Sequence, residues 1–373
     1  MKFSIKQNIL MEHLNYVIKG VSSKNLIPIL NCIKFELTDE GLYMLSTDNE
    51  IAIKTFINKD KIDNIDTKGE LVISGRYIYD IIRKLPNEII NIEEVMESKI
   101  FISTTNSSFN LNSNDASEFP TLDLEGNKTP INLSKRTFKT MITQTSFATS
   151  NQESRPILTG INFKIENDKL ECTATDSYRL AKKIIKLNEE ARENINITIP
   201  NKNLMELVKL LNDEDDNIEL HIFNNKIIFK FNDIVFMSRL INGNFPDTNK
   251  LIPEEFLIRI TCNFNELYNS IDRASLLTTE AEKNTIKLES NNESIVISSN
   301  IPEIGNVKET VYIKKITSEN ITISFNAKYM LDALKSINGE DVELLFNSDI
   351  KPIIIKSPNV DNLIQLILPI RTY

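Results

Sequence analysis

Residues 76–85 read RYIYDIIRKL, residues 202–211 read KNLMELVKLL, and residues 328–337 read KYMLDALKSI. Successive copies start 126 residues apart, and the chain of 373 residues holds almost three such periods. Each copy has a basic first and eighth residue and an acidic fifth residue. Three unrelated helices could share this pattern by chance, but other features recur at the same period. We therefore predict one structural unit that is used three times.

The apolar residues of each copy lie at the third, sixth, seventh and tenth positions. This spacing places them on one face of an α-helix, which we expect to be buried. The two basic residues lie off this face and should point to solvent or to a partner. The acidic residue is four positions after the first cation and three before the second, so it can brace both along the helix surface.

Further features of the repeat predict an α+β fold. Phe119-Pro120 returns 126 residues later as Phe245-Pro246. A second amphipathic helix opens each repeat, and alternating runs such as residues 33–37 and 226–231 are typical of antiparallel strands. The helix anchors are Leu10, Leu14 and Val17, then Phe138, Met141 and Ile142, then Leu267, Ile271 and Ala274. We predict three domains, at residues 1–126, 127–252 and 253–373.

Composition narrows the function classes. No apolar run approaches the roughly 20 residues that span a bilayer, and the N-terminus has no signal-peptide pattern, so we expect a cytoplasmic protein. The three cysteines, Cys32, Cys172 and Cys262, are far apart and have neither metal-ligand nor disulfide spacing, which suits a reducing compartment. The net charge of −9 does not exclude nucleic acid, because the distribution of charge matters more than its sum.

No catalytic constellation is visible in the sequence. The two histidines, His13 and His221, belong to different repeats, and no phosphate-binding loop or H-E-x-x-H motif is present. Asp48 and Asp176 each follow a threonine at equivalent places of two repeats, so they are structural residues first. We interpret the acidic run at residues 213–216 as a solvated loop rather than a metal site. We therefore expect no enzyme, no cofactor and no metal.

Four segments carry a resemblance to a known family. They are residues 26–30 (LIPIL), 175–180 (TDSYRL), 243–247 (GNFPD) and 368–371 (LPIR). Together with the threefold repeat they resemble the bacterial sliding clamps, the beta subunits of DNA polymerase III, over the whole chain. The resemblance implies a DNA clamp fold, in which two three-domain chains join head to tail in a ring. Helices line the hole and antiparallel sheets form the outer wall.

The same resemblance implies a processivity factor that encircles duplex DNA. Cations around a channel can hold phosphates without reading bases, so the ring can slide. The implied DNA-binding residues are Lys24, Arg76, Arg83, Lys135, Lys139, Gln152, Lys202, Lys209, Arg273, Lys328 and Lys335. An acidic outer surface would repel DNA, which fits the negative net charge.

The resemblance also implies a hydrophobic pocket that takes short extended peptides. The implied partners are the polymerase III alpha subunit, the clamp loader, and other polymerases and repair proteins. The pocket residues would be Arg155, Leu158, Thr175, Tyr178, Arg179, Leu180, Pro246, Leu251, Leu366, Leu368, Pro369, Ile370 and Arg371. From the residues alone, an inter-domain core is the favoured interpretation, and the resemblance reverses that preference. The last two residues, Thr372 and Tyr373, extend beyond the family's usual end and could cover the pocket.

The homodimer interface implied by the family pairs a strand of the first repeat with a strand of the third. The implied residues are Phe109, Leu111, Leu276, Leu277 and Glu303. Two other functions remain open at this point. A nucleic-acid enzyme would need a carboxylate or histidine cluster, and a repeat scaffold would bind protein only.

Overall fold

The structure is a computed structural model that describes residues 1–22, 27–96, 98–126, 129–212, 216–317, 319–358 and 360–371. The chain divides into two compact units. Unit 1 contains residues 1–136 and 203–240, and unit 2 contains residues 137–202 and 241–373. The central repeat thus contributes to both units.

Unit 1 is built on one antiparallel sheet, in which the described residues place thirteen strands. Their order is β10-β15-β16-β17-β4-β3-β2-β6-β9-β8-β7-β1-β5. The strands are β1 (Lys2–Lys6), β2 (Cys32–Leu37), β3 (Gly41–Thr47), β4 (Ile51–Asn58), β5 (Asn64–Thr67), β6 (Gly69–Ser74), β7 (Ile89–Met96), β8 (Lys99–Ser103), β9 (Ser108–Asn114), β10 (Ile131–Ser134), β15 (Asn217–Ile222), β16 (Lys226–Phe231) and β17 (Ile234–Arg239).

The turn between β2 and β3 depends on a glycine. Gly41 has a φ of +151°, which L side chains rarely adopt. A Cβ at this position would also lie 2.0 Å from the carbonyl oxygen of Ile57 on β4. Backbone space at residue 41 therefore favours glycine in the turn at residues 38–41.

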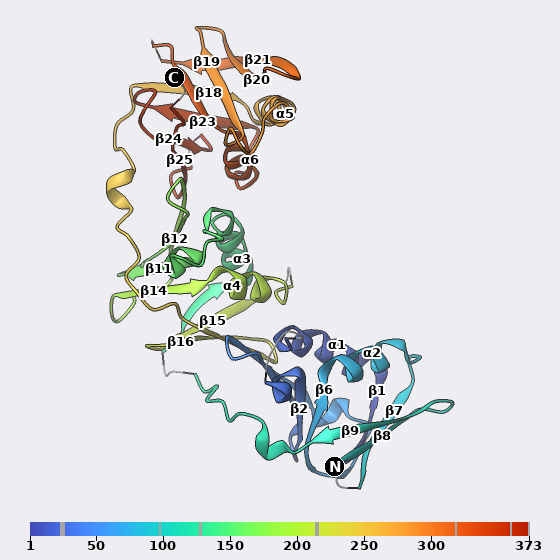
Figure 1. Ribbon diagram of the computed structural model, residues 1–373. Helices are drawn as coiled ribbons and strands as arrows, with labels where there is room; N and C mark the ends of the chain where they lie inside the picture. The colour runs from blue at the N-terminus through green and yellow to red at the C-terminus, as the bar shows by residue number, and fades with distance from the viewer. Residues whose placement is uncertain are drawn as a thin grey trace. The chain divides into compact units, whose positions relative to one another are not determined.

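Two helices pack side by side in unit 1, namely α1 (Gln7–Val17) and α2 (Gly75–Lys84) (Figure 1). Leu10 and Leu14 of α1 and Ile78 and Ile82 of α2 are fully buried. The predicted apolar faces are therefore confirmed as the surfaces that these helices bury, since each face follows the helical period.

Unit 2 is built on a second antiparallel sheet, in which the described residues place twelve strands. Their order is β14-β11-β12-β13-β25-β24-β23-β18-β21-β20-β19-β22. The strands are β11 (Gly160–Glu166), β12 (Lys169–Thr175), β13 (Arg179–Lys186), β14 (Ile195–Pro200), β18 (Ile258–Asn263), β19 (Thr285–Ser290), β20 (Ser294–Ile301), β21 (Gly305–Ile316), β22 (Thr322–Asn326), β23 (Asp341–Phe346), β24 (Ile353–Lys356) and β25 (Leu363–Ile367).

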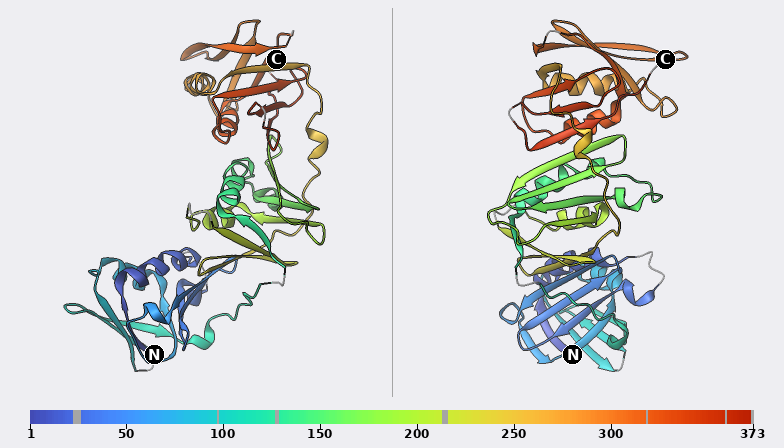
Figure 2. Two further views of the ribbon diagram at one scale, coloured as in Figure 1. Left: turned by 180° about the vertical axis from the view of Figure 1, so that it is seen from behind. Right: turned by 90° about the vertical axis from the view of Figure 1, so that its left-hand side faces the viewer.

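Helices α5 (Phe264–Ser275) and α6 (Ala327–Lys335) lie side by side in unit 2 (Figure 2). The side chains of Asn263 and Asn326 accept hydrogen bonds from backbone N–H groups in the first turns of α5 and α6, so each helix begins at a polar cap. The chain passes between the units within α3 (Lys135–Thr143) and α4 (Asn201–Val208). Short 3₁₀ turns lie at Ile18–Gly20, Pro28–Asn31, Lys59–Lys61, Ala116–Glu118, Ser146–Ala148, Pro156–Thr159 and Asn249–Leu251.

Each sheet continues across a boundary between repeats. In unit 1, β17 of the central repeat pairs with β4 of the first repeat. In unit 2, β25 of the third repeat pairs with β13 of the central repeat. Backbone hydrogen bonds therefore join neighbouring repeats, and the three domain boundaries remain predictions from the sequence. None of the helices in the described ranges is long and apolar enough to cross a bilayer.

Candidate functional site

The three repeated helices expose their predicted cations. Arg76 and Arg83 of α2, Lys202 of α4, Lys209 just beyond it, and Lys328 and Lys335 of α6 are all exposed. Within the described residues, the first cation of each copy, Arg76, Lys202 or Lys328, forms no ion pair. These three charges are free to meet a phosphate.

In the first two copies, the acidic residue forms an ion pair with the second cation of the copy but not, within the described residues, with the first. Asp80 lies 2.7 Å from Arg83, and Glu206 lies 2.7 Å from Lys209. The prediction that it could brace both cations is therefore too broad. The pairs are exposed, so they orient the cations more than they stabilise the fold.

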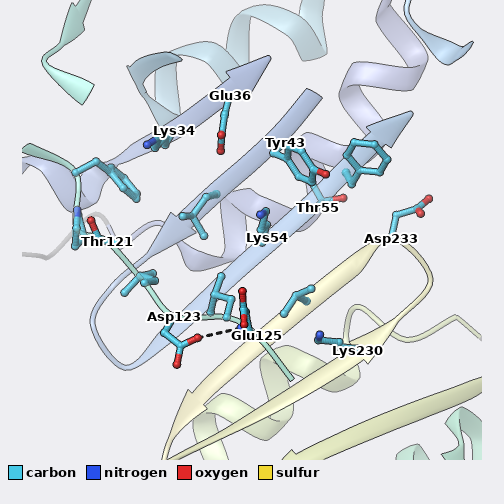
Figure 3. Close-up of a pocket in the computed structure, with 17 residues that line it drawn as sticks. Lys34, Glu36, Tyr43, Lys54, Thr55, Thr121, Asp123, Glu125, Lys230 and Asp233 are labelled. Carbon is cyan, nitrogen blue, oxygen red and sulfur yellow. Dashed lines mark hydrogen bonds between the residues drawn. The ribbon is translucent and has the colours of Figure 1, made fainter. Parts of the chain in front are cut away.

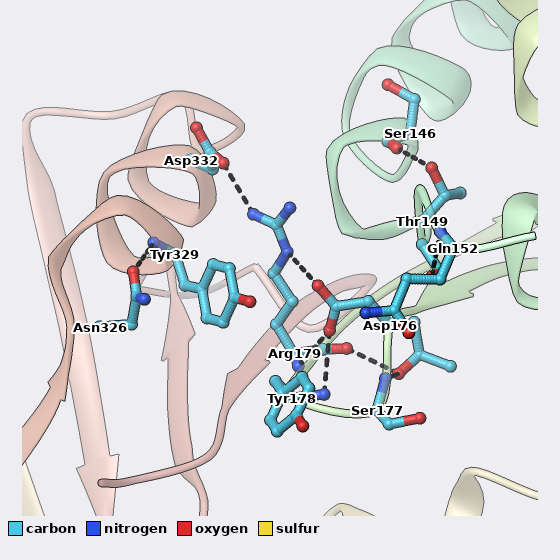
Figure 4. A network of polar contacts seen from close by, with 12 residues as sticks. Ser146, Thr149, Gln152, Asp176, Ser177, Tyr178, Arg179, Asn326, Tyr329 and Asp332 are labelled. Carbon is cyan, nitrogen blue, oxygen red and sulfur yellow. Dashed lines mark hydrogen bonds and ion pairs between the residues drawn. The ribbon is translucent and has the colours of Figure 1, made fainter. Parts of the chain in front are cut away.

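The third copy differs because its acidic residue contacts Arg179 of the predicted peptide pocket. Asp332 of α6 lies 2.7 Å from the guanidinium of Arg179, which also contacts Asp176 at 3.0 Å (Figure 4). The Tyr329 ring lies 4.5 Å from the same guanidinium. Burial is the largest cause that raises the pKa of the Tyr329 hydroxyl. These contacts hold the Arg179 side chain, at the start of β13, against α6.

Lys135 is a correction to the predicted DNA-facing set. It is 1% exposed, and its ammonium contacts Asp216 at 3.2 Å, Asn212 at 3.1 Å and Asn232 at 2.8 Å. A buried, bonded ammonium cannot reach a phosphate, so we remove Lys135 from the set. Lys135 precedes the buried anchor Phe138 by three positions, and that spacing could have revealed its burial. The neighbouring Arg136 is exposed and was missed.

The other predicted DNA-facing residues differ in their surroundings. Lys139 is half-buried on α3, and Gln152 is exposed in a turn. Arg273 of α5 binds Glu309 through two nitrogens, at 3.0 and 2.6 Å, and this hydrogen-bonded pair lowers the pKa of Glu309. Glu309 therefore partly neutralises the charge of Arg273. Lys24 lies outside the described residues.

An apolar cluster in unit 2 unites part of the predicted peptide pocket. Leu180 of β13 and Leu366 of β25 are register partners and are buried together with Leu345 of β23 and Ile354 of β24. The linker side chains Ile252 and Phe256 pack against them. The sequence reasoning missed these four neighbours, because no local pattern separates them from other core residues.

A hydrogen-bonded turn holds the rim of this cluster. The hydroxyl of Thr175 donates to the Arg179 carbonyl oxygen at 2.7 Å, and Asp176 accepts from the backbone N–H of Tyr178 at 2.9 Å (Figure 4). The N–H of Leu368 donates to the Tyr178 carbonyl oxygen at 2.9 Å, so the tail is fixed beside the turn. The predicted Thr-Asp-x-x-Arg-Leu segment and the tail therefore meet.

Large apolar side chains remain uncovered at this rim. Tyr178 is 60% exposed and Leu368 is 37% exposed. Leu251, which directly precedes the cluster residue Ile252, is 48% exposed. Such exposure of neighbouring apolar groups marks a surface for a ligand or a partner. The remaining predicted residues comprise buried Leu158, partly buried Pro369 and Ile370, and exposed Arg155, Pro246 and Arg371.

In unit 1, three residues occupy the same strand-pairing positions as three residues of this cluster, but the residues at the rim are different. The matched positions are Leu180 and Ala52, Ile354 and Ile228, and Leu366 and Met237. The matching backbone bond runs from the N–H of Arg239 to the Glu50 carbonyl oxygen, also at 2.9 Å. Charged Arg239 and Glu50 thus stand where unit 2 has Leu368 and Tyr178. The apolar rim therefore lies in unit 2, at Leu368 and Tyr178, and its counterpart in unit 1 is charged.

A hollow of about 540 Å³ lies near this counterpart in unit 1, between residues 119–125 and the strands (Figure 3). Its lining includes Lys34, Lys54 and Lys230 as well as Glu36 and Asp233. Charges of both signs line it, in contrast to the apolar rim in unit 2.

The reactive residue types of the chain are buried or scattered. Cys32, Cys172 and Cys262 are buried and unpaired, and burial raises the pKa of Cys262 to about 12. A neutral buried thiol is a poor nucleophile. Across the part of the chain that the structure describes, no group of three or more metal-ligating side chains comes together.

Two strand edges and an apolar helix end are exposed at the predicted dimer interface. Among the described residues, β9 pairs with β8 only along Phe109–Leu111, and β21 pairs with β20 but not with β18 over residues 305–312. Leu276 is 79% exposed, and Leu277 is half-buried. Glu303 is exposed near the start of β21. These features leave β9 and β21 available for pairing.

Comparison with known proteins gives a consistent result. Residues 1–123, 132–247 and 249–371 match the N-terminal, central and C-terminal domains of the DNA polymerase III beta subunit. The beta sliding clamps of Staphylococcus epidermidis and Bacillus subtilis are both 41% identical, with 100% of each chain covered. The crystal structure of the Bacillus subtilis DNA polymerase sliding clamp matches with a TM-score of 0.97, 41% identity and full coverage of both chains. The crystal structure of the DNA polymerase III subunit beta from Pseudomonas aeruginosa matches with a TM-score of 0.94 at 25% identity over both whole chains.

The repeated α+β fold and its exposed basic helices define a DNA clamp. The chain belongs to the family of DNA polymerase III beta subunits, the beta sliding clamps. The predicted function, a non-catalytic sliding clamp rather than an enzyme, is thereby confirmed, and a scaffold that binds only protein is not supported.

Proposed function

We propose that two copies of this chain close head to tail into a ring that encircles duplex DNA. The proposal rests most heavily on strand pairing. The last strand of the central repeat, β17, pairs with β4, and the last strand of the third repeat, β25, pairs with β13. The last strand of the first repeat is β9, and the third repeat's counterpart of β4 and β13 is β21. Among the described residues, β9 and β21 each keep part of one edge unpaired. A second copy supplies the missing pair, because open edges recruit strands.

Phe109, Leu111, Leu276, Leu277 and Glu303 would line this interface. Contact with a partner would cover the exposed side chain of Leu276. An interface with this many apolar side chains depends chiefly on buried apolar area.

The channel would be lined by Arg76, Arg83, Lys139, Gln152, Lys202, Lys209, Arg273, Lys328 and Lys335, with Arg136 added and Lys135 removed. Their exposed cations support phosphate contacts that carry no sequence information. Such contacts permit sliding, since each is exchanged for an equal one at the next phosphate.

The rim formed by Tyr178, Leu251 and Leu368 over the Leu180 cluster would dock extended apolar peptides of partner proteins. The proposed partners are the polymerase III alpha subunit, the clamp loader, and other polymerases and repair proteins. Exposed apolar side chains beside a buried apolar cluster favour this mode of recognition. A separate ATP-driven loader would have to open the ring.

Topology gives the test of the ring. The protein is placed on closed circular duplex DNA by a clamp loader, and release is followed after the circle is cut once. A ring that encircles DNA remains on the circle and leaves the linear product from its ends. Equal retention on circular and linear DNA would contradict encirclement.

A peptide titration tests the pocket. A fluorescent peptide of the Gln-Leu-x-Leu-Phe type should bind saturably, and Leu251→Ala with Leu368→Ala should weaken it about tenfold or more, because both lose apolar contact area. The matched control is Ile89→Ala, which removes an exposed apolar side chain from unit 1. Equal loss in the control would mean that the peptide binds elsewhere.

A further inference from the structure

A basic hollow lies in unit 2 on strands β19 to β22. Its volume is about 880 Å³, and it is lined by four cations, Lys283, Lys287, Lys308 and Arg371, against one carboxylate, Glu282. On a chain with a net charge of −9, this is a local reversal of sign. Within the described residues, Lys283, Lys308 and Arg371 form no ion pair, and Lys287 pairs with the exposed Glu289 at 2.8 Å.

The register explains why these cations gather. Lys287 of β19 is opposite Ser298 of β20, and Ser298 is opposite Lys308 of β21. Residues in one such row project from the same side of a sheet. The next residue of β20, Ser299, is buried and donates to the Ala274 carbonyl oxygen of α5 at 2.8 Å. Lys287 and Lys308 therefore project from the side of the sheet that faces away from α5.

The chain's tail connects this hollow with the peptide rim. The Leu368 N–H bonds to the Tyr178 carbonyl oxygen, and the Ile370 N–H bonds to the Ser324 carbonyl oxygen of β22 at 2.7 Å. Arg371, the next residue, lines the hollow. Three residues of extended chain span about 10 Å, so the rim and the hollow are neighbours along the tail.

We propose that the hollow binds an acidic segment that flanks the apolar core of a docked partner peptide. This inference rests on the proposed peptide pocket and names the class of peptide that the pocket prefers. Continuity along the tail and complementary charge favour such a peptide. A nucleic acid is less suited, because the lysines project away from the helix α5 that carries the channel residue Arg273. An acidic flank at only one end of the apolar core would reach the hollow, because the hollow lies at one end of the rim.

Matched peptides test the inference on the full-length protein. A Leu-x-Leu-Phe core carries four glutamates before it, four glutamates after it, or four glutamines at either end, and fluorescence anisotropy gives each Kd at low and at high salt. We expect glutamates at one end only to tighten binding about three- to tenfold at low salt, with the gain lost at high salt. Equal Kd values for glutamate and glutamine flanks would overturn the inference.

Variants locate the effect. Lys287→Gln with Lys308→Gln should remove most of the glutamate gain and leave the Kd of the glutamine-flanked core unchanged. Lys169→Gln, at an exposed lysine that starts β12 outside the hollow, should retain the gain. Charge reversal provides a further check. In the variant that combines Lys287→Glu with Lys308→Glu, a peptide with a lysine flank should bind with a lower Kd than one with a glutamate flank. A glutamate gain that persists in the glutamine variants would overturn the assignment to this hollow.

Two further outcomes separate the alternatives. Absence of binding by the glutamine-flanked core would overturn the peptide pocket itself, and with it this extension. A single-stranded oligonucleotide whose binding is lost in the lysine variants, while the glutamate gain persists, would assign the hollow to nucleic acid.

Discussion

The guanidinium of Arg179 lies 2.7 Å from the carboxylate of Asp332, although 153 residues separate them in the chain. Arg179 opens β13 beside the proposed peptide rim, and Asp332 lies on α6 between Lys328 and Lys335. The equivalent acids of the other two helices pair within their own helix instead. One ion pair therefore joins the proposed peptide site to a helix proposed to face DNA.

Replacement of Asp332 should cost more than replacement of its counterpart in unit 1. Asp332→Asn leaves a mostly buried guanidinium with one partner fewer, and we expect a loss of about 1–2 kcal/mol in the free energy of unfolding of unit 2. Asp80→Asn is the control, because its pair with Arg83 is exposed and should matter by at most about 0.5 kcal/mol. Hydrogen exchange resolved by unit measures both. Equal effects would mean that burial of Arg179 is unimportant.

Lys135→Met should destabilise unit 1 without changing DNA binding. Its ammonium is the donor for Asn212, Asp216 and Asn232, and its loss should cost about 1–2 kcal/mol. In contrast, Lys202→Gln should reduce the salt dependence of duplex binding by up to about 0.9 in the slope of log K against log salt. Chemical unfolding and binding at several salt concentrations separate the two. A reduced slope in Lys135→Met would place Lys135 in the channel after all.

Leu276→Asp should open the proposed ring without unfolding the protomer. The side chain is exposed in the single chain, so the substitution should not lower the thermal stability of the monomer. In a dimer it would bury a charge, and we expect the dissociation constant to rise at least about 100-fold. Sedimentation velocity measures this. Leu257→Asp, at another exposed leucine of unit 2, should remain a dimer, and dimeric Leu276→Asp would show that the interface lies elsewhere.

His13 should make the protein less stable in mild acid. Its imidazole is buried and lies 2.6 Å from the Thr55 hydroxyl, and burial, the largest cause, lowers its pKa below 6.5. The unfolded chain then binds the proton more readily than the folded chain, so stability falls as pH drops below about 6.5. Thermal unfolding between about pH 7.5 and 5.5 measures the slope. His13→Gln should flatten it, and an unchanged slope would exclude His13 as a cause.

Much of the fold could be predicted because its signals are local. The apolar stripe that includes Ile78 and Ile82 follows the helical period, and both residues are buried as expected. The turn at Gly41 and the strands around it also follow short patterns. The 126-residue repeat extends this reasoning over the whole chain, and the family resemblance supplied the pocket and the ring.

The peptide site was predicted only in part, for a physical reason. Thr175 and Leu180 belong to one local segment, but Leu345 and Ile354 join them through strand register. A shift of one residue in that register would turn each side chain to the other face of the sheet. No local pattern specifies a partner more than 150 residues away.

The sequence by itself determined the repeated α+β unit, its buried helix faces and the positions of its cations, because periodicity acts over a few turns of chain. Tertiary structure decided which of those charges are available. It buries Lys135 beside Asp216, pairs Arg273 with Glu309, and diverts Asp332 to Arg179. Each choice depends on residues that are distant in the chain and meet only when strands and helices pack.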